Sequence, residues 1–194
     1  MGRAVTRGIR NYLAWDEAMN VNPPWNPTNL TVPSIAEASP DGRGVGNTLH
    51  EDATVAASHY IEYSPAMDIL NQYRYTLGIR AKAENRDWLR LMFVLAGVDA
   101  ECYFDVANGV VGTASATVDA ANIQLIATDW YECWITFLAD QTAFANSVRI
   151  DVAEADSDIT FDGLDQDSLT VFRPQLCEGW GLDPAIYTSE VPLT

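Results

Sequence analysis

The sequence predicts an all-β protein, a two-sheet antiparallel β-sandwich of the jelly-roll type. No segment of ten or more residues repeats apolar side chains at the helical period. Several runs instead alternate apolar and polar residues, as half-buried strands do. Turn sequences rich in Gly, Asn, Asp and Pro separate these runs at the spacing found in sandwiches. With 194 residues, 48% of them hydrophobic, the chain can build one sizeable core.

Alternation is clearest in YRYTLGIRAKA, where apolar and aromatic residues fall on one face and mostly polar residues on the other. The first face has Tyr73, Tyr75, Leu77 and Ile79, and the second has Arg74, Thr76 and Arg80. WLRLMFVL is more continuously apolar, which indicates a central strand covered on both faces. In chain order, we predict strands at Thr48–Glu51, His59–Tyr63, Tyr73–Ala83, Trp88–Val94, Ala100–Val106, Asn122–Ile126, Trp130–Phe137, Ser147–Val152 and Ser168–Leu176.

The connections carry their own signals. Asn108-Gly109 favours a tight hairpin, so Cys102–Val106 is expected to pair with Val110–Thr113. Pro174 lacks an amide donor and predicts an edge or a bulge in the last long strand. Asp140–Ala145 is expected to form a short helical turn. The prolines of VNPPWNPTN exclude regular structure, so this segment is expected to run over the surface or reach a neighbouring subunit.

Charge is distributed unevenly along the chain, whose net charge is −16. Residues 1–10 carry Arg3, Arg7 and Arg10 and no acid, whereas residues 91–194 hold 2 basic and 17 acidic side chains. We therefore divide the chain into a basic N-terminal arm (1–10) and a jelly-roll domain (11–194). An acidic body repels phosphate and anionic lipid, so neither nucleic acid nor membrane is an expected partner. No apolar segment follows the arm, so no secretory signal is expected.

Reactive or metal-binding constellations are sparse. The three cysteines Cys102, Cys133 and Cys177 lie in apolar runs without CxxC spacing, which indicates buried thiols rather than a metal site. His50 and Glu51 point to opposite faces of a strand, so they do not form an acid–base pair. Calcium binding stays an alternative for the acidic stretch 151–167, because carboxylate oxygens are ligands of calcium. The stretch does not, however, continue as an EF-hand loop. We expect no catalytic residue, no other cofactor and no enzyme activity.

Aromatic residues supply the binding candidates. Trp88, Trp130 and Trp134 alternate with polar neighbours inside strands and are expected in the core. Trp25, in NPPWNP, and Trp180, in GWG, are expected in loops, where a ring can stack on a sugar. Together with Tyr187 they are the predicted glycan- or partner-binding residues.

The order of many short motifs resembles that of a known group of domains. RNYLAW, NLTV, SPDGRG, LHED, SHYIEY, YTLGIRAKAENRDWLRL, CYFDVANGVVG, WYECWITF, VRIDVAEAD and VFRPQLCEGW follow one another over about residues 10–190. This order resembles a jelly-roll domain of phage tail fibres, tail spikes and head fibres, which is similar to carbohydrate-binding modules and concanavalin A-like lectins. Two departures stand out: Cys177 replaces an acid, and Lys82-Ala83-Glu84 lacks the usual glycine.

The resemblance implies a virion structural protein, displayed on the particle surface as a capsid decoration or head-fibre protein. Its partners would be the major capsid protein or other virion proteins, further copies of itself in a trimer, and host or environmental glycans. Capsid attachment is assigned to the arm and to the Pro/Trp segment: Arg3, Arg7, Arg10, Pro23 and Pro24. The alternative is a carbohydrate-binding module of a tail fibre or spike that mediates host adhesion.

Overall fold

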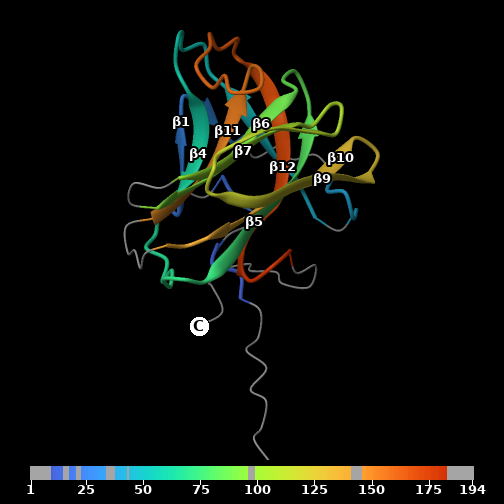
Figure 1. Ribbon diagram of the computed structural model, residues 1–194. Helices are drawn as coiled ribbons and strands as arrows, with labels where there is room; N and C mark the ends of the chain where they lie inside the picture. Colours follow the sequence, from blue (N-terminus) through green and yellow to red (C-terminus); the bar gives the residue numbers. More distant parts are fainter. Residues whose placement is uncertain are drawn as a thin grey trace, which may run out of the picture.

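Two antiparallel β-sheets packed face to face make up the protein in a computed structural model (Figure 1). The described part of the chain contains strands and turns but no helix, and therefore none long and apolar enough to cross a membrane. The all-β jelly-roll sandwich predicted from the sequence is thus confirmed. The structure describes residues 10–14, 18–20, 23–33, 38–42, 44–95, 99–140 and 146–182.

Each sheet has six strands. The first has the order β1-β4-β11-β6-β7-β8, formed by Trp25–Thr28, His59–Tyr63, Asn146–Ala153, Trp88–Leu95, Ala100–Asp105 and Val110–Ala114. The second has the order β2-β3-β12-β5-β10-β9, formed by Leu30–Thr31, Asn47–Glu51, Gln166–Glu178, Arg74–Ala83, Trp130–Leu138 and Val118–Ala127. Strands that are far apart in sequence are therefore neighbours in space, as β11 and β6 show.

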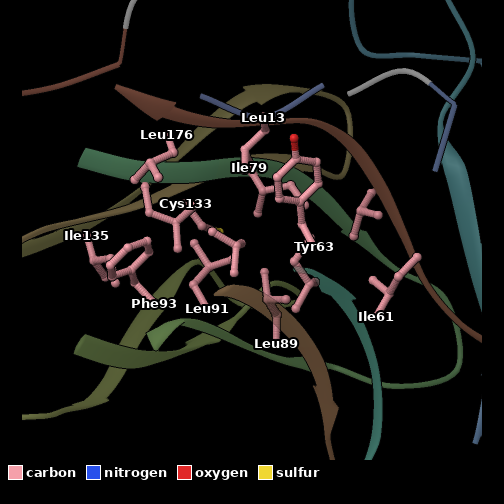
Figure 2. Packing of buried hydrophobic residues seen from close by; sticks show 14 of the residues in the cluster. Leu13, Ile61, Tyr63, Ile79, Leu89, Leu91, Phe93, Cys133, Ile135 and Leu176 are labelled. Atoms are coloured by element: carbon pink, nitrogen blue, oxygen red, sulfur yellow. The ribbon is translucent and has the colours of Figure 1, made fainter. Parts of the chain in front are cut away.

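Alternating side chains of the two sheets meet in one core. Leu89, Leu91 and Phe93 of β6 are fully buried and face residues of the second sheet such as Ile79 and Cys133 (Figure 2). Phe93 stacks on Phe137 of β10 with ring centroids 4.8 Å apart. At one side, Leu13 joins the same cluster, and the Tyr12 amide donates to the Leu176 carbonyl at 2.9 Å.

The predicted turn features are present. β7 and β8 form the Asn108-Gly109 hairpin, and Gly109 adopts a left-handed φ of +69°. The register between β12 and β5 shifts between Phe172 and Gln175, so Pro174 lies in a bulge of an interior strand rather than at an edge. All three cysteines are free and buried, as expected. The predicted turn at 140–145 falls almost entirely outside the described residues.

Two expectations about tryptophan-containing segments were wrong. Trp25–Thr28 is a strand that pairs with β4, because the edge position of β1 tolerates Pro27, which has no amide to donate. Trp88 and Trp134 are only half-buried and share their faces with Arg90 and Glu132, so they lie on the outer faces of the sheets and not in the core. Trp130 is buried, but it packs against Gly46 outside the central cluster.

Candidate functional site

The outer face of the first sheet carries an ordered array of polar and aromatic side chains. Successive residues of a strand point to opposite faces, so the neighbours of the buried Leu89, Leu91 and Ile150 point outward. We call this surface the polar face. Its members on β4, β11, β6 and β7 are Tyr60, Glu62, Arg149, Asp151, Trp88, Arg90, Met92, Glu101 and Tyr103.

One row of the polar face crosses four strands. Tyr60 is opposite Asp151, Asp151 is opposite Arg90, and Arg90 is opposite Tyr103. Three steps between neighbouring strands give the row a length of about 14 Å. Tyr60 at one end is half-buried, Tyr103 at the other end is buried, and the middle is a pair of opposite charges.

The charges in the middle of the row are buried and paired. Asp151 has no exposed surface; its oxygens accept from Arg90 Nε at 3.2 Å and from a terminal nitrogen of Arg90 at 3.0 Å. The same carboxylate accepts from Arg149 at 2.6 Å, and Arg90 also donates to Glu101 at 2.7 Å. Two guanidinium groups are therefore held by carboxylates at fixed positions on the sheet.

Burial and pairing act in opposite directions on Arg90. Burial lowers the pKa of its guanidinium, but the charges of Asp151 and Glu101 raise this pKa by more, so it ends above its ordinary value. Burial also raises the pKa of the Tyr103 hydroxyl. Both groups keep their protons at neutral pH and can act as hydrogen-bond donors.

Aromatic rings lie beside this charged centre. The guanidinium carbon of Arg149 lies 3.6 Å from the centre of the half-buried Tyr60 ring, a close cation–π contact. Arg149 Nε is buried and has no hydrogen-bond partner within the described ranges. One row away, Trp88 extends across β7 as far as β8, where a Cβ added at Gly112 would come within 2.6 Å of its ring. The glycine thus makes room for the tryptophan.

A polar loop supports the same end of the face. Asp156, which follows β11, accepts hydrogen bonds from the amide and the hydroxyl of Thr113 on β8 at 2.8 and 2.9 Å. These bonds hold the loop beside Trp88. Both side chains lie over Gly112, where an added Cβ would meet the Asp156 carboxylate as well as the Trp88 ring. The polar face therefore combines two half-buried rings with a rigid, charged floor.

The outer face of the second sheet is built differently. Trp134 lies on it, opposite Gly78 of β5, and the chain after β12 returns across this face. Leu182 occupies the space above Gly78, and Trp180 stacks on Arg74 at 4.8 Å. The chain itself therefore covers part of this face.

The structure separates the binding residues predicted from the sequence. Trp25 has no exposed surface and its Nε1 donates to the Ala14 carbonyl at 3.1 Å, so its prediction as a stacking residue was wrong. Trp180 is 64% exposed and stays a candidate. Tyr187 lies outside the described residues.

The residues predicted to attach the protein to a capsid are only partly described. Arg3 and Arg7 lie outside the described ranges. Arg10 packs its guanidinium 4.7 Å from the centre of the Tyr12 ring. Pro23 is exposed and Pro24 half-buried just before β1. Their role in attachment, like the boundary at residue 10, stays a prediction.

The acidic stretch does not form a common site. Asp156 binds Thr113, and Asp162 accepts from the Ala56 amide at 2.8 Å. Asp165 and Asp167 both bind His50. Across the described ranges, no three His, Cys, Asp or Glu side chains converge in a way that could hold a metal ion.

His50 and Glu51 point to opposite faces, as expected. Glu51 is buried and accepts from Arg86 at 2.8 Å and from the Ser168 hydroxyl at 2.8 Å. Burial raises the pKa of Glu51, but its bonds to Arg86, Ser168 and the Leu164 amide lower it below the ordinary value. This pair ties β3 to the turn before β6.

Sequence reasoning missed the polar face, although a signal was available. Arg90 and Asp151 each interrupt a strand whose alternate residues are apolar, and a charge in such a strand needs a partner nearby. Opposite charges on two central strands could have indicated the pair. Their register, however, depends on the strand order.

Comparisons with known proteins support the fold. No family model matches the chain, and no curated protein is significantly similar to it. Among solved structures, the carbohydrate-binding module TmCBM61, determined in complex with β-1,4-galactotriose, is similar over 86% of this chain and 97% of its own, with 15% identity and a TM-score of 0.51.

The enzymatically active domain of tailspike protein 4 from bacteriophage CBA120 is similar over 87% of this chain, with 12% identity and a TM-score of 0.51. The match spans 21% of that tailspike structure. Identities this low show a shared architecture. The protein thus has the jelly-roll sandwich fold that a carbohydrate-binding module and part of a phage tailspike also have.

Proposed function

We propose that this protein is a glycan-binding module that uses the polar face as its binding surface. The half-buried rings of Tyr60 and Trp88 carry the proposal, because they lie beside guanidinium groups that Asp151 holds at fixed positions on the sheet. Sugar rings present C–H groups that pack on aromatic faces and hydroxyls that accept from charged donors. The similar module solved with a galactotriose supports this choice of ligand class.

The test measures retention on a panel of immobilised polysaccharides, followed by calorimetric titration with the best oligosaccharide. Trp88→Ala and Tyr60→Ala are each expected to weaken binding about tenfold, which corresponds to about 1.4 kcal/mol. Trp134→Ala is the matched control, since it removes a half-buried tryptophan from the outer face of the other sheet. Its affinity should equal that of the wild type.

Trp180→Ala tests the rival surface predicted from the sequence. Loss of binding in Trp180→Ala or Trp134→Ala, with Trp88→Ala and Tyr60→Ala unaffected, would move the site to the second sheet. Absence of retention on every glycan would refute the proposal. Thermal melts of all four variants verify that each is folded.

We further propose that the module acts in adhesion on the surface of a phage particle. The motif order of the sequence supports this setting, and the tailspike among the similar structures favours the tail over capsid decoration. Immunogold labelling of purified particles should mark the tail. Labelling distributed over the heads would support capsid decoration instead, and unlabelled particles would contradict both.

A further inference from the structure

The two sheets end side by side at strands β8 and β9, which follow each other in the chain. β9 contains ten residues, and within the described part of the chain it pairs only with β10 (Figure 1). An edge strand presents unpaired N–H and C=O groups to a further strand.

This edge is longer and more regular than the opposite edges of the two sheets. The opposite edges of the two sheets are β1, with four residues including Pro27, and β2, with two residues. Short strands and prolines are common protections. β9 has neither, although its register with β10 shifts near both ends, which leaves Ala120–Leu125 as the regular part. Its only charge is Asp119, which is paired with Arg74 at 3.1 Å.

Exposed apolar side chains gather at one end of this edge. Val110, Val111, Leu125 and Ile126 are four of the ten large hydrophobic residues that are exposed in the described structure. Tyr131 on β10 shows that they lie at the same end. It is opposite Leu125, and its ring lies so close to Gly109, the residue before Val110, that an added Cβ there would come within 2.6 Å of it. Burial of this cluster would favour association.

The distribution of charge also favours association through this edge. The protein carries a net charge of −16, so most of its surface repels a second copy. Residues 110–127 contain Asp119 as their sole ionisable side chain. Two copies can therefore approach each other here with the least repulsion.

We propose that the protein forms a two-fold dimer in which β9 pairs antiparallel with β9 of a second copy. A register centred on Asn122 sets Ala120 opposite Gln124 of the partner copy and Ala121 opposite Ile123 of the partner copy, all within the regular part of β9. Parallel pairing in register would instead bring the two Asp119 side chains together. Antiparallel pairing thus makes the edge complementary to itself.

The pairing offers enough hydrogen bonds for a specific contact. In an antiparallel ladder, alternate residues direct both N–H and C=O to the same neighbour. The six regular residues Ala120–Leu125 on each copy therefore supply about six hydrogen bonds, within the range found in ordinary protein interfaces. The pairing uses a strand of the second sheet, whereas the polar face lies on the first, so the inference does not rest on glycan binding.

Sedimentation velocity between about 1 and 100 µM tests the dimer, since association depends on concentration. The wild type is expected to shift from monomer to dimer over this range. The double variant Ala120→Glu with Gln124→Glu sets like charges opposite each other across the two-fold axis and should weaken dimerisation at least tenfold. The double variant Ala120→Glu with Gln124→Lys sets opposite charges there and should restore it.

Thr31→Glu adds a charge to β2, the other edge of the same sheet, and should leave the dimer unchanged. Hydrogen exchange of the wild type supplies a readout without any variant: amides of β9 should become more protected as concentration rises. A wild type that stays monomeric, a trimer, or a dimer unaffected by the two glutamates would each overturn the proposal.

Discussion

Replacing Asp151 with Asn removes one charge from the most buried ion-pair network of the polar face. The side chain keeps its shape, but Arg90 and Arg149 lose the carboxylate that holds them at 3.0 and 2.6 Å. Arg90 is 6% exposed and cannot turn to water without leaving its place on β6. Removing one partner of a buried pair leaves the other charge uncompensated.

The expected loss of unfolding free energy is about 3–5 kcal/mol, the range measured when one member of a buried pair is removed. With a urea dependence of about 2 kcal/mol per molar, the unfolding midpoint falls by about 1.5–2.5 M. Glu101 still binds Arg90, so the lower part of this range applies. Equilibrium urea unfolding, followed by tryptophan fluorescence, measures the shift.

Glu132→Gln is the matched control. It makes the same carboxylate-to-amide change in a strand, but Glu132 is partly exposed and accepts one bond from Arg80 at 3.3 Å. Its expected loss is below about 1 kcal/mol. Equal midpoints for Asp151→Asn and Glu132→Gln would refute the view that the buried network is held by Asp151.

Three further predictions concern the core, the thiols and pH. Phe137→Ala removes a fully packed ring between Tyr75 and Phe93 and is expected to lower the unfolding free energy by about 3–5 kcal/mol in the same urea assay. The thiol of Cys102 is buried, which raises its pKa to about 12, so a thiol reagent at pH 8 should label none of the three cysteines until the protein is unfolded. The hydrogen bond to Asp167 raises the pKa of His50, so its contribution to stability is complete below about pH 6.5 and disappears as pH rises through the folded-state pKa. His50→Asn should therefore lower the urea midpoint at pH 5.5 but not at pH 9; the opposite order would contradict the assignment.

Strand alternation predicted most of the fold, because its signal is local. The hairpin at Asn108-Gly109 and the bulge at Pro174 followed from backbone chemistry at single residues. The same reasoning failed at Trp25, since prolines that exclude an interior strand do not exclude an edge strand. For Trp88, the sequence did contain the answer: it has the same parity as Arg90 and therefore points away from the core.

The candidate site was less predictable because it depends on strand order. Tyr60, Asp151, Arg90 and Tyr103 are separated by up to about ninety positions in the chain and become one row only when β11 lies between β4 and β6. No local pattern specifies that order. The sequence therefore assigned carbohydrate binding to Trp25 and Trp180, whereas the side chains that we propose for it lie on the polar face.

The same network leads to a prediction about binding. Asp151 is fully buried and does not reach a ligand, yet its bonds fix Arg90 and Arg149 before any sugar arrives. A preorganised surface loses little conformational entropy on binding. At a low temperature, where Asp151→Asn and the wild type are both folded, calorimetry should therefore show weaker glycan binding by Asp151→Asn, with a larger entropy loss. Because Tyr60 and Trp88 are unchanged in this variant, equal affinities and equal entropies would show that the two rings bind sugar without the ordered guanidinium groups between them.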